Sequence, residues 1–359
     1  MKPQAPAAGE AAPSRFDALR HPGTLLAPER RLVASYDLEV AGQSPAGHIA
    51  ATEADAGLLN AAERPFRLDY ARLTEVHVIN GMGVALGDSI IGLTALAALR
   101  AAHPALRFVL YRPARLAAHV EALYRLAGSE PAAPRTLPWP LDALPRAATR
   151  IDVGNQLYRP AFATLPMIDY FLDALGADPA SIPAAARRNR WLARLALPAL
   201  PDGWSRRPYA LLCADASTPL RSIPAAERAA LVERIARHYG LPVAGFGPVA
   251  HRAYTDVSAL SPDTAAYLAW VRDARVLVGA DSSAIHVADG FEVPTLACFT
   301  SITPEMRVRD YPHCVAARLD VPAALRDRHA SDEPAHLAAV AAAYRVFDWD
   351  AIAWPRARD

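Results

Sequence analysis

The chain of 359 residues has room for two α/β domains, because a domain most often contains about 100–150 residues. Its 38 lysine and arginine residues and 37 aspartate and glutamate residues leave a net charge of +1, which argues against a protein that coats a polyanion. Lys2 is the only lysine, so chemistries that need a Walker A lysine or a lysine Schiff base are excluded.

The cysteines indicate neither a disulfide framework nor a metal site. Cys213, Cys298 and Cys314 lie far apart in the sequence and form no CxxC pair.

The sequence shows no sign of export or of a membrane span. The N-terminus lacks the apolar core of a signal peptide, and no later segment runs for ~18 residues without a polar interruption. We therefore expect a cytoplasmic protein in a reducing compartment.

Residues 1–74 precede the first clear pattern. Residues 1–15 are rich in proline and alanine, and they are predicted to be a disordered lead. Residues 16–74 form an N-terminal extension to which the sequence assigns no role. Within it, Leu32–Val40 is predicted to be a strand and Ala50–Ala62 a short helix.

A first Rossmann-like domain is predicted over residues 75–177, where strands and helices alternate. Alternation of this kind produces a parallel sheet covered by helices. The predicted strands are Val76–Asn80, Arg107–Tyr111 and Ile151–Asn155. The predicted helices are Ser89–Ala102, Leu116–Leu126 and Met167–Leu175.

Residues 178–208 are a predicted linker, because prolines break helices and this stretch holds Pro179, Pro183, Pro198, Pro201 and Pro208. A second Rossmann-like domain is predicted over residues 209–332, and a C-terminal helix and tail over residues 333–359. The predicted strands of the second domain are Tyr209–Cys213, Pro242–Gly247, Arg275–Asp281 and Thr295–Phe299. The predicted fold is α/β, with two doubly wound parallel-sheet domains and a cleft between them.

A glycine-rich loop, GMGVALGD over residues 81–88, follows the first strand of the first domain. Glycines here let a ligand approach the backbone, and the start of the next helix favours an anion. The loop also resembles a dinucleotide fingerprint, in which Arg112 would hold a 2′-phosphate. Asp88, at the end of the loop, is either a general base for a hydroxyl group or a helix cap.

Polar residues follow a buried strand of the second domain. Asp281 ends that strand, Ser282 and Ser283 begin a helix, and His286 lies on the helix. Hydroxyl groups and helix N–H groups can hold a diphosphate without a lysine. Taken singly, Ser282 is an N-cap and His286 a core histidine; together at one strand end they indicate a ligand site.

Thr218 and Arg221 lie in a loop between a predicted strand and a predicted helix. A guanidinium group can bind a phosphate with two parallel hydrogen bonds. The loop follows a strand end that opens on the same predicted cleft, which favours Arg221 over the other arginines as a phosphate ligand.

These three pieces, in this order, resemble the family 9 glycosyltransferases, which include the ADP-heptose-dependent heptosyltransferases of bacterial envelope assembly. The resemblance covers roughly Glu75 to Pro312. The family's opening signature is matched by Gly87–Asp88 and Leu99–Pro104. Its closing signature is matched by Asp281–His286, Val293–Pro294 and Phe299–Pro304.

The resemblance implies a GT-B fold and an inverting, metal-independent glycosyltransferase without a cofactor. Asp88 is implied to be the base that activates the acceptor hydroxyl. The residues implied on the acceptor-side loop are Gly81, Met82, Gly83 and Gly87. The residues implied to bind the donor are Thr218, Arg221, Gly247, Asp281, Ser282, Ser283, Ala284 and His286.

The implied donor is a nucleotide-diphosphate sugar, with ADP-heptose as the first choice. The implied acceptor is a hydroxyl group of an envelope saccharide, as in lipopolysaccharide biosynthesis, or of a protein. No nucleic-acid partner is expected, and peripheral association with the inner face of the inner membrane is an option. The oligomeric state stays open.

Several residues depart from the family pattern. Ser283 and Thr300 stand where the family has glycine, and Arg221 replaces the lysine of its Lys-x-Trp-Pro loop. The strand end Gly245–Pro248 lacks the acidic residue expected near the nucleoside.

Two alternatives therefore stay open. The first is a non-catalytic nucleotide-sugar-binding or assembly module of the same fold. The second is an NADP-dependent oxidoreductase built on the glycine-rich loop and Arg112, which leaves the motif at Asp281 without a use.

Overall fold

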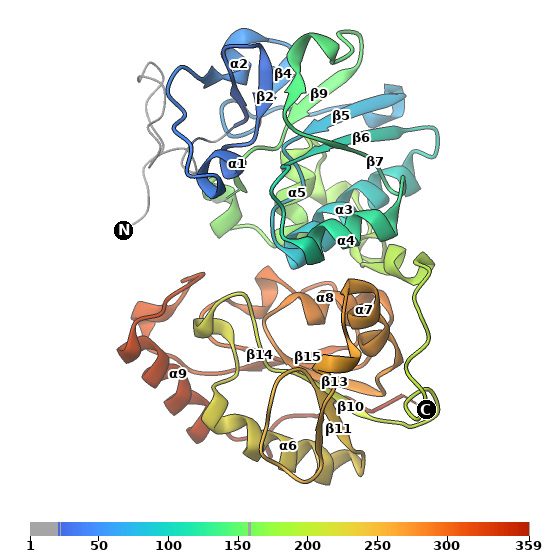
Figure 1. Ribbon diagram of the computed structural model, residues 1–359, viewed down its shortest axis with the longest axis vertical. Helices are drawn as coiled ribbons and strands as arrows, with labels where there is room; N and C mark the ends of the chain where they lie inside the picture. Colours follow the sequence, from blue (N-terminus) through green and yellow to red (C-terminus); the bar gives the residue numbers. More distant parts are fainter. Residues whose placement is uncertain (1–20, 22, 157–158, 359) are drawn as a thin grey trace. The chain divides into compact units, whose positions relative to one another are not determined.

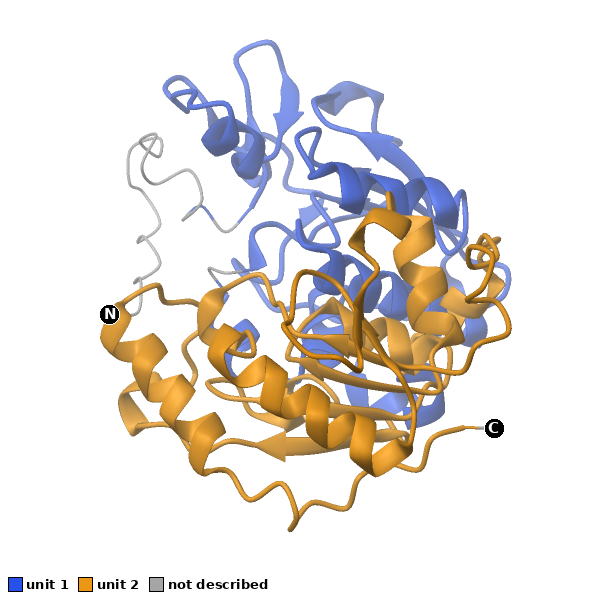
Figure 2. Ribbon diagram, turned by 60° about the horizontal axis from the view of Figure 1, so that its bottom comes forward, with its two compact units in different colours: residues 1–187 blue, residues 188–359 orange. Residues whose placement is uncertain are grey.

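A computed structural model describes residues 21, 23–156 and 159–358. The predicted disordered lead, residues 1–15, lies outside the described residues. The chain divides into unit 1, Met1–Arg187, and unit 2, Arg188–Asp359, which Figure 2 colours separately. The division falls inside the segment predicted to be a linker.

Unit 1 is built on a parallel sheet of five strands in the order β4-β9-β5-β6-β7. These are β4 (Leu58–Leu59), β9 (Thr149–Asp152), β5 (Glu75–Ile79), β6 (Arg107–Arg112) and β7 (Ala133–Thr136). After β5 the chain adds β6 and β7 on one side, and it later adds β9 on the other side. The loops that follow β5 and β9 therefore diverge at one point of the carboxyl edge, where ligands bind in sheets of this kind.

Three helices of unit 1 lie together on one side of the strands in Figure 1. They are α3 (Leu86–Ala102), α4 (Ala118–Ala127) and α5 (Met167–Ala174). α3 is apolar around most of its circumference, and eleven of its residues are buried. A helix of that composition must be covered on several sides, and α4 and α5 pack against it.

The described part of the N-terminal extension belongs to unit 1 and contributes to a small antiparallel sheet in the order β3-β1-β2-β8. Its elements are β1 (Leu25–Leu26), β2 (Arg31–Val33), α1 (Ser35–Val40), β3 (Ile49–Ala50) and α2 (Ala51–Ala54), with β8 (Trp139–Pro140) from later in the chain. The strand predicted over Leu32–Val40 is wrong after Val33, because α1 begins at Ser35. The helix predicted over Ala50–Ala62 ends at Ala54, and the chain then forms β4.

The extension covers a face of the parallel sheet. Ile79 of β5 and Tyr111 of β6 belong to one buried cluster with Leu26 and Leu32 of the extension. Strands of parallel sheets are apolar on both faces and need cover on both. Helices cover one face of this sheet, and the cluster supplies cover on the other.

Unit 2 contains a parallel sheet of six strands in the order β12-β11-β10-β13-β14-β15. The strands are β10 (Ala210–Cys213), β11 (Val243–Gly245), β12 (Tyr254–Asp256), β13 (Val276–Ala280), β14 (Thr295–Phe299) and β15 (Cys314–Arg318). This is the order of a doubly wound dinucleotide-type sheet, and the strand order reverses between β10 and β13. The sequence did not predict β12 and β15, the two outer strands.

Helices lie on both sides of the unit 2 strands in Figure 1. α6 (Ala225–Tyr239) and α9 (Pro334–Val346) share a buried cluster with β10 and β13. α7 (Thr264–Asp273) and α8 (Ser283–Gly290) pack on each other, and α8 packs on β13 and β14. The prediction of two α/β units with parallel sheets is confirmed; a cleft between them stays a prediction.

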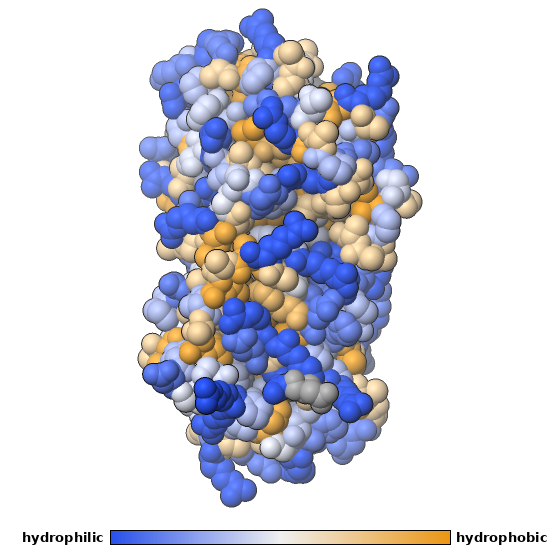
Figure 3. Space-filling view, turned by 90° about the vertical axis from the view of Figure 1, so that its right-hand side faces the viewer, coloured by the Kyte–Doolittle hydropathy of each residue, from blue (hydrophilic) through white to orange (hydrophobic). Residues whose placement is uncertain are grey.

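The face in Figure 3 is mainly hydrophilic, with hydrophobic residues in small groups. Within the described residues, no helix is both long and apolar enough to span a bilayer.

The close packing of Gly92 on Met82 gives a test of the unit 1 core. A Cβ atom at Gly92 would collide with Cβ of Met82, which is fully buried. We expect Gly92→Ala to lower the free energy of unfolding by about 1–3 kcal/mol in urea titrations. Ala101→Ser, on the exposed end of the same helix, should change it by less than about 0.7 kcal/mol. Equal unfolding midpoints for the two variants would contradict this packing.

Candidate functional site

Asp88 lies at the carboxyl edge of the unit 1 sheet, where β5 leads into α3. The N-cap of α3 is Ala85, and Asp88 lies in the first helical turn. Asp88 is therefore not the N-cap. Its half-buried carboxylate lies at the helix start, where N–H groups and the helix dipole favour negative charge.

Gln156 holds the Asp88 carboxylate, although no sequence motif marks it. The side-chain amide of Gln156 donates a hydrogen bond to Oδ2 of Asp88 at 2.6 Å. Gln156 follows β9, the neighbour of β5. The two loops that diverge at this edge are therefore joined across it, and the carboxylate is fixed in orientation.

Glycines of the loop make room for Asp88. Gly83 has φ +82°, and a Cβ atom on it would lie 2.5 Å from Cβ of Asp88. Gly81 is buried beside Val78, so the loop starts inside the core. Met82 is fully buried, so its side chain fills the core and only its backbone can serve an acceptor-side loop.

A buried arginine and a buried tyrosine lie near the carboxylate. The Arg159 guanidinium lies 4.9 Å from the ring centroid of Tyr170, and its Nη2 is 3.4 Å from Oδ2 of Asp173. Burial raises the pKa of Tyr170, and the charge of Asp88 raises it further. The Asp88 charge thus acts on a buried side chain of unit 1, and charges interact more strongly there than in water.

The position of Arg112 argues against the oxidoreductase alternative. Arg112 is buried, and its two terminal nitrogens donate to the Glu121 carboxylate at 2.6 and 3.1 Å. Its guanidinium also lies 4.2 Å from the ring centroid of Tyr124. These contacts fasten α4 to the end of β6. A 2′-phosphate would have to displace Glu121 to reach this guanidinium.

In unit 2, Arg221 and Asp281 meet where the strand order reverses. Arg221 follows β10 and Asp281 follows β13. Nη1 of Arg221 donates to Oδ2 and to the carbonyl oxygen of Asp281, both at 3.1 Å. Nη2 donates to Oγ of Ser217 at 2.6 Å. The guanidinium is therefore held in one orientation.

Buried polar atoms near this pair have unmet hydrogen-bonding capacity. Within the described part of the chain, Arg221 Nε, Thr218 Oγ1 and Ser301 Oγ have no hydrogen-bond partner. Thr218 lies on the Arg221 loop, and Ser301 follows β14, the strand next to β13. An unpaired buried donor costs about 1–3 kcal/mol. A ligand that supplies acceptors here would remove that cost.

The hydroxyl groups at the start of α8 already have structural partners. Oγ of Ser282 caps the helix by accepting from the N–H of Ala284 at 3.4 Å. Ser283 forms a hydrogen bond with Tyr267. The two serines therefore shape the helix start, whose backbone N–H groups favour an anion.

His286 is buried, and a chain of hydrogen-bonding side chains holds it. The Tyr311 hydroxyl accepts a hydrogen bond from Nδ2 of Asn189 at 2.7 Å and lies 2.9 Å from Nδ1 of His286. Burial lowers the pKa of His286 to about 3.

The hydrogen bonds that hold His286 continue to the start of unit 2. The Asp289 carboxylate accepts from the N–H and Nδ2 of Asn189 at 2.9 and 3.1 Å. It also accepts from Nε of Arg188 at 2.9 Å. Arg188 and Asn189 lie in the segment predicted to be a linker, and they position the histidine through Tyr311.

Arg307 and His329 also lie in this region, and the sequence motifs did not identify them. Nε of the buried Arg307 is 3.9 Å from Oδ1 of Asp281, so two guanidinium groups meet one carboxylate. Burial, together with the charges of Arg307 and Arg221, lowers the pKa of His329 to about 4. Arg307 follows the closing signature by three residues, but nothing local in the sequence separates it from other arginines.

Two departures from the family pattern have structural explanations. Thr300, in place of glycine, donates from Oγ1 to the carbonyl of Leu220 at 2.9 Å and ties the end of β14 to the Arg221 loop. Gly247 has φ +86°, and its N–H donates to Oδ1 of Asp256 at 3.1 Å. Asp256, from the unpredicted strand β12, brings a carboxylate to the strand end that lacks one in the sequence.

No group of three or more His, Cys, Asp or Glu side chains among the described residues is arranged to hold a metal ion.

Comparison with known proteins places several glycosyltransferases among the similar solved structures. ADP-heptose lipopolysaccharide heptosyltransferase II of E. coli is 16% identical, with a TM-score of 0.43, over 76% of this chain and 99% of that one. A family 9 glycosyltransferase from Veillonella parvula is 16% identical, with a TM-score of 0.43, over 71% of this chain and 87% of that one. The dodecameric iron-containing glycosyltransferase TibC of E. coli is 14% identical, with a TM-score of 0.45, over 72% of this chain and 63% of that one.

No protein-family model and no curated protein matches the chain. The function is therefore argued from the residues of the two units.

Two histidines of unit 2, the buried His286 and the half-buried His329, predict a loss of stability in acid. The pKa values of His286 and His329 in the folded state, about 3 and about 4, lie below the ordinary value of 6.5. The unfolded chain therefore binds protons first as the pH falls below 6.5, and the stabilisation present above that pH is lost. Each group contributes a slope of about 1.4 kcal/mol per pH unit to the free energy of unfolding.

Urea titrations between pH 7 and 4.5 should thus show a shallower slope for His329→Gln than for the wild type. His238→Gln, on the exposed surface of α6, should retain the wild-type slope. Identical slopes for all three proteins would show that His329 is not held neutral by burial.

Proposed function

We propose that the protein is an inverting glycosyltransferase that moves a sugar from a nucleotide-diphosphate donor to a hydroxyl group of an acceptor. The observation that carries the proposal is that each unit has its distinctive polar site where its strand order reverses. In unit 1 the site is a carboxylate, Asp88. In unit 2 it is a set of buried donors around Arg221.

The unit 2 site suits a diphosphate leaving group. Phosphate oxygens are acceptors. Thr218 Oγ1, Ser301 Oγ and Arg221 Nε offer buried donors that lack acceptors within the described residues. A diphosphate with its nucleoside seated near Gly247 would accept from them. ADP-heptose is the first candidate donor, because the motif at Asp281 resembles that of the heptosyltransferases.

The transfer itself requires that the two sites face each other in the working protein. Asp88 takes the proton from the acceptor hydroxyl as the oxygen attacks the anomeric carbon. The bond between that carbon and the diphosphate oxygen breaks, and the diphosphate leaves with the electron pair. Arg221, Arg307 and the N–H groups at the start of α8 stabilise the charge that develops on it. No metal ion takes part in this scheme.

The acceptor is a hydroxyl group of a saccharide or a protein. A cytoplasmic location, with the enzyme at the inner face of the inner membrane when the acceptor is lipid-linked, belongs to the same proposal. A non-catalytic module would use the unit 2 site to bind the donor and would leave Asp88 without a function, so the role of Asp88 separates the two.

Replacement of Asp88 tests the proposed base. Asp88→Asn keeps an oxygen for the hydrogen bond from Gln156 but cannot take a proton. We expect transfer from ADP-heptose, measured by ADP release, to fall by about 10²–10⁴-fold. The ADP dissociation constant should change less than about twofold. Asp142→Asn, which removes an exposed carboxylate paired with Arg30, serves as the control. A turnover of Asp88→Asn equal to that of the control would refute the assignment.

Replacement of Arg307 tests the donor site. A hydrogen bond to a charged group contributes about 1.5–3 kcal/mol. We therefore expect Arg307→Gln to raise the ADP dissociation constant in calorimetry by about 10–100-fold. Binding of AMP, which lacks the second phosphate, should weaken less.

Arg309→Gln is the matched control, because Arg309 pairs with its neighbour Asp310 on the same loop. Arg307→Lys, which keeps the charge, should bind ADP with intermediate affinity. If Arg307→Gln and Arg309→Gln bind ADP equally well, Arg307 is not part of the donor site.

A further inference from the structure

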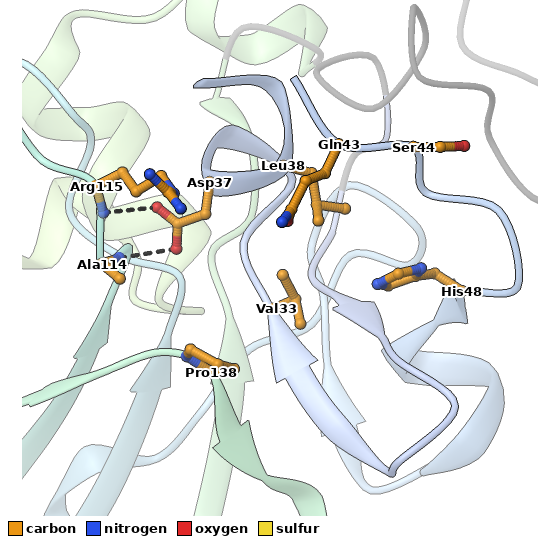
Figure 4. A pocket seen from close by; sticks show the side chains of 9 residues that line it. All are labelled: Val33, Asp37, Leu38, Gln43, Ser44, His48, Ala114, Arg115 and Pro138. Atoms are coloured by element: carbon orange, nitrogen blue, oxygen red, sulfur yellow. Dashed lines mark hydrogen bonds between the residues drawn. The ribbon is translucent and has the colours of Figure 1, made fainter. Parts of the chain in front are cut away.

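A cavity of about 600 Å³ lies in unit 1 between the N-terminal extension and the loop after β6 (Figure 4). It is lined by Val33, Asp37, Leu38, Gln43, Ser44, His48, Ala114, Arg115 and Pro138. Its volume falls in the range of small-molecule sites, about 300–1,000 Å³. Neither the motifs nor the glycosyl transfer chemistry uses these residues.

The cavity has a fixed wall. The buried Asp37 of α1 accepts hydrogen bonds from the backbone N–H groups of Ala114 and Arg115, each at 2.8 Å. Figure 4 shows both bonds side by side, one to each carboxylate oxygen. The extension is thereby fastened to the loop, and the cavity has its shape before any ligand arrives, which lowers the cost of binding.

The lining combines an apolar floor with uncharged hydrogen-bonding groups. Val33, Leu38 and Pro138 present apolar surface, and Gln43 offers an amide. Nδ1 of His48 lies 3.1 Å from the carbonyl oxygen of Pro45, which only accepts, so Nδ1 carries the proton. In the neutral ring Nε2 is then an acceptor. His48 lies just before β3, and in Figure 4 its ring extends toward Val33.

The charges of the lining balance. Asp37 is the acidic lining residue, Arg115 is the basic one, and the Arg115 charge acts on the Asp37 carboxyl group. Asp37 would repel an anionic ligand and Arg115 would repel a cationic one. The pair as a whole therefore adds no binding energy for a ligand of either charge. A ligand with hydroxyl groups, which both donate and accept, matches the amide and the imidazole, and C–H groups match the floor.

The cavity lies on the same side of unit 1 as Asp88. The Ala114–Arg115 loop follows β6, the Asp88 loop follows β5, and the two strands are paired in parallel. Both loops therefore leave the sheet at its carboxyl edge. We propose that the cavity binds an uncharged saccharide and that this saccharide is part of the acceptor; the second part rests on the proposed function.

The test is saturation-transfer NMR on the full chain with three probes: a neutral methyl glycoside, an acidic sugar of the same size, and a short peptide that contains serine and threonine. We expect signal from the methyl glycoside. Gln43→Trp, which fills the cavity from an exposed position, should weaken that binding at least tenfold. His48→Ala should weaken it, and His48→Gln, which retains an acceptor, should restore part of it.

Glu39→Trp is the matched control, because Glu39 is an exposed residue of α1 outside the cavity lining, and it should bind the glycoside like the wild type. Equal binding by Gln43→Trp and Glu39→Trp would overturn the proposal, and so would binding of only the acidic sugar or the peptide. ADP binding separates the two proposals. If the wild-type protein binds the glycoside but neither binds ADP nor releases ADP from ADP-heptose, the glycosyltransferase proposal is refuted and the cavity assignment stands.

Discussion

The order of strands in the two parallel sheets is the constraint on which the candidate site depends. Where the order reverses, neighbouring strands send their loops in opposite directions, and backbone and side chains at the edge are left uncovered by the connections. In unit 1 this places the loops after β5 and β9 together, and Gln156 binds Asp88 there. In unit 2 it places the loops after β10 and β13 together, and Arg221 binds Asp281. The same rule of topology thus builds both halves of the proposed enzyme.

A second constraint explains the N-terminal extension. A parallel sheet is apolar on both faces, and in unit 1 the helices α3, α4 and α5 lie on one of them. Leu26 and Leu32 of the extension join the buried cluster around Ile79 and Tyr111. The extension therefore has a structural reason to be present, and the cavity beside Asp37 arises from the way it is fastened to the sheet.

Local patterns in the sequence predicted what depends on local physics. Alternation of strands and helices, the glycine-rich loop and the turn at Asp281 all follow from residues close together in the chain. Gln156 and Asn189 escaped prediction because each acts on a partner 68 or more residues away, and only the strand order brings them together. The resemblance implied Met82 as a residue of the acceptor-side loop, yet Gly92 opens a space in α3 that the Met82 side chain fills. The strands β12 and β15 lie at the edges of the sheet, and Ala317 is the only one of their residues that is buried. β12, with the sequence YTD, lacks the apolar run that marks a central strand.

Arg221 makes three hydrogen bonds, to the side chain and carbonyl of Asp281 and to Ser217, from two different nitrogens of one planar group. A lysine has a single side-chain nitrogen and cannot span these acceptors in the same geometry. The Arg221 guanidinium therefore ties Ser217 to Asp281 in one unit. The two side chains are expected to be coupled energetically, so that the effect of replacing Ser217 depends on whether Arg221 is present.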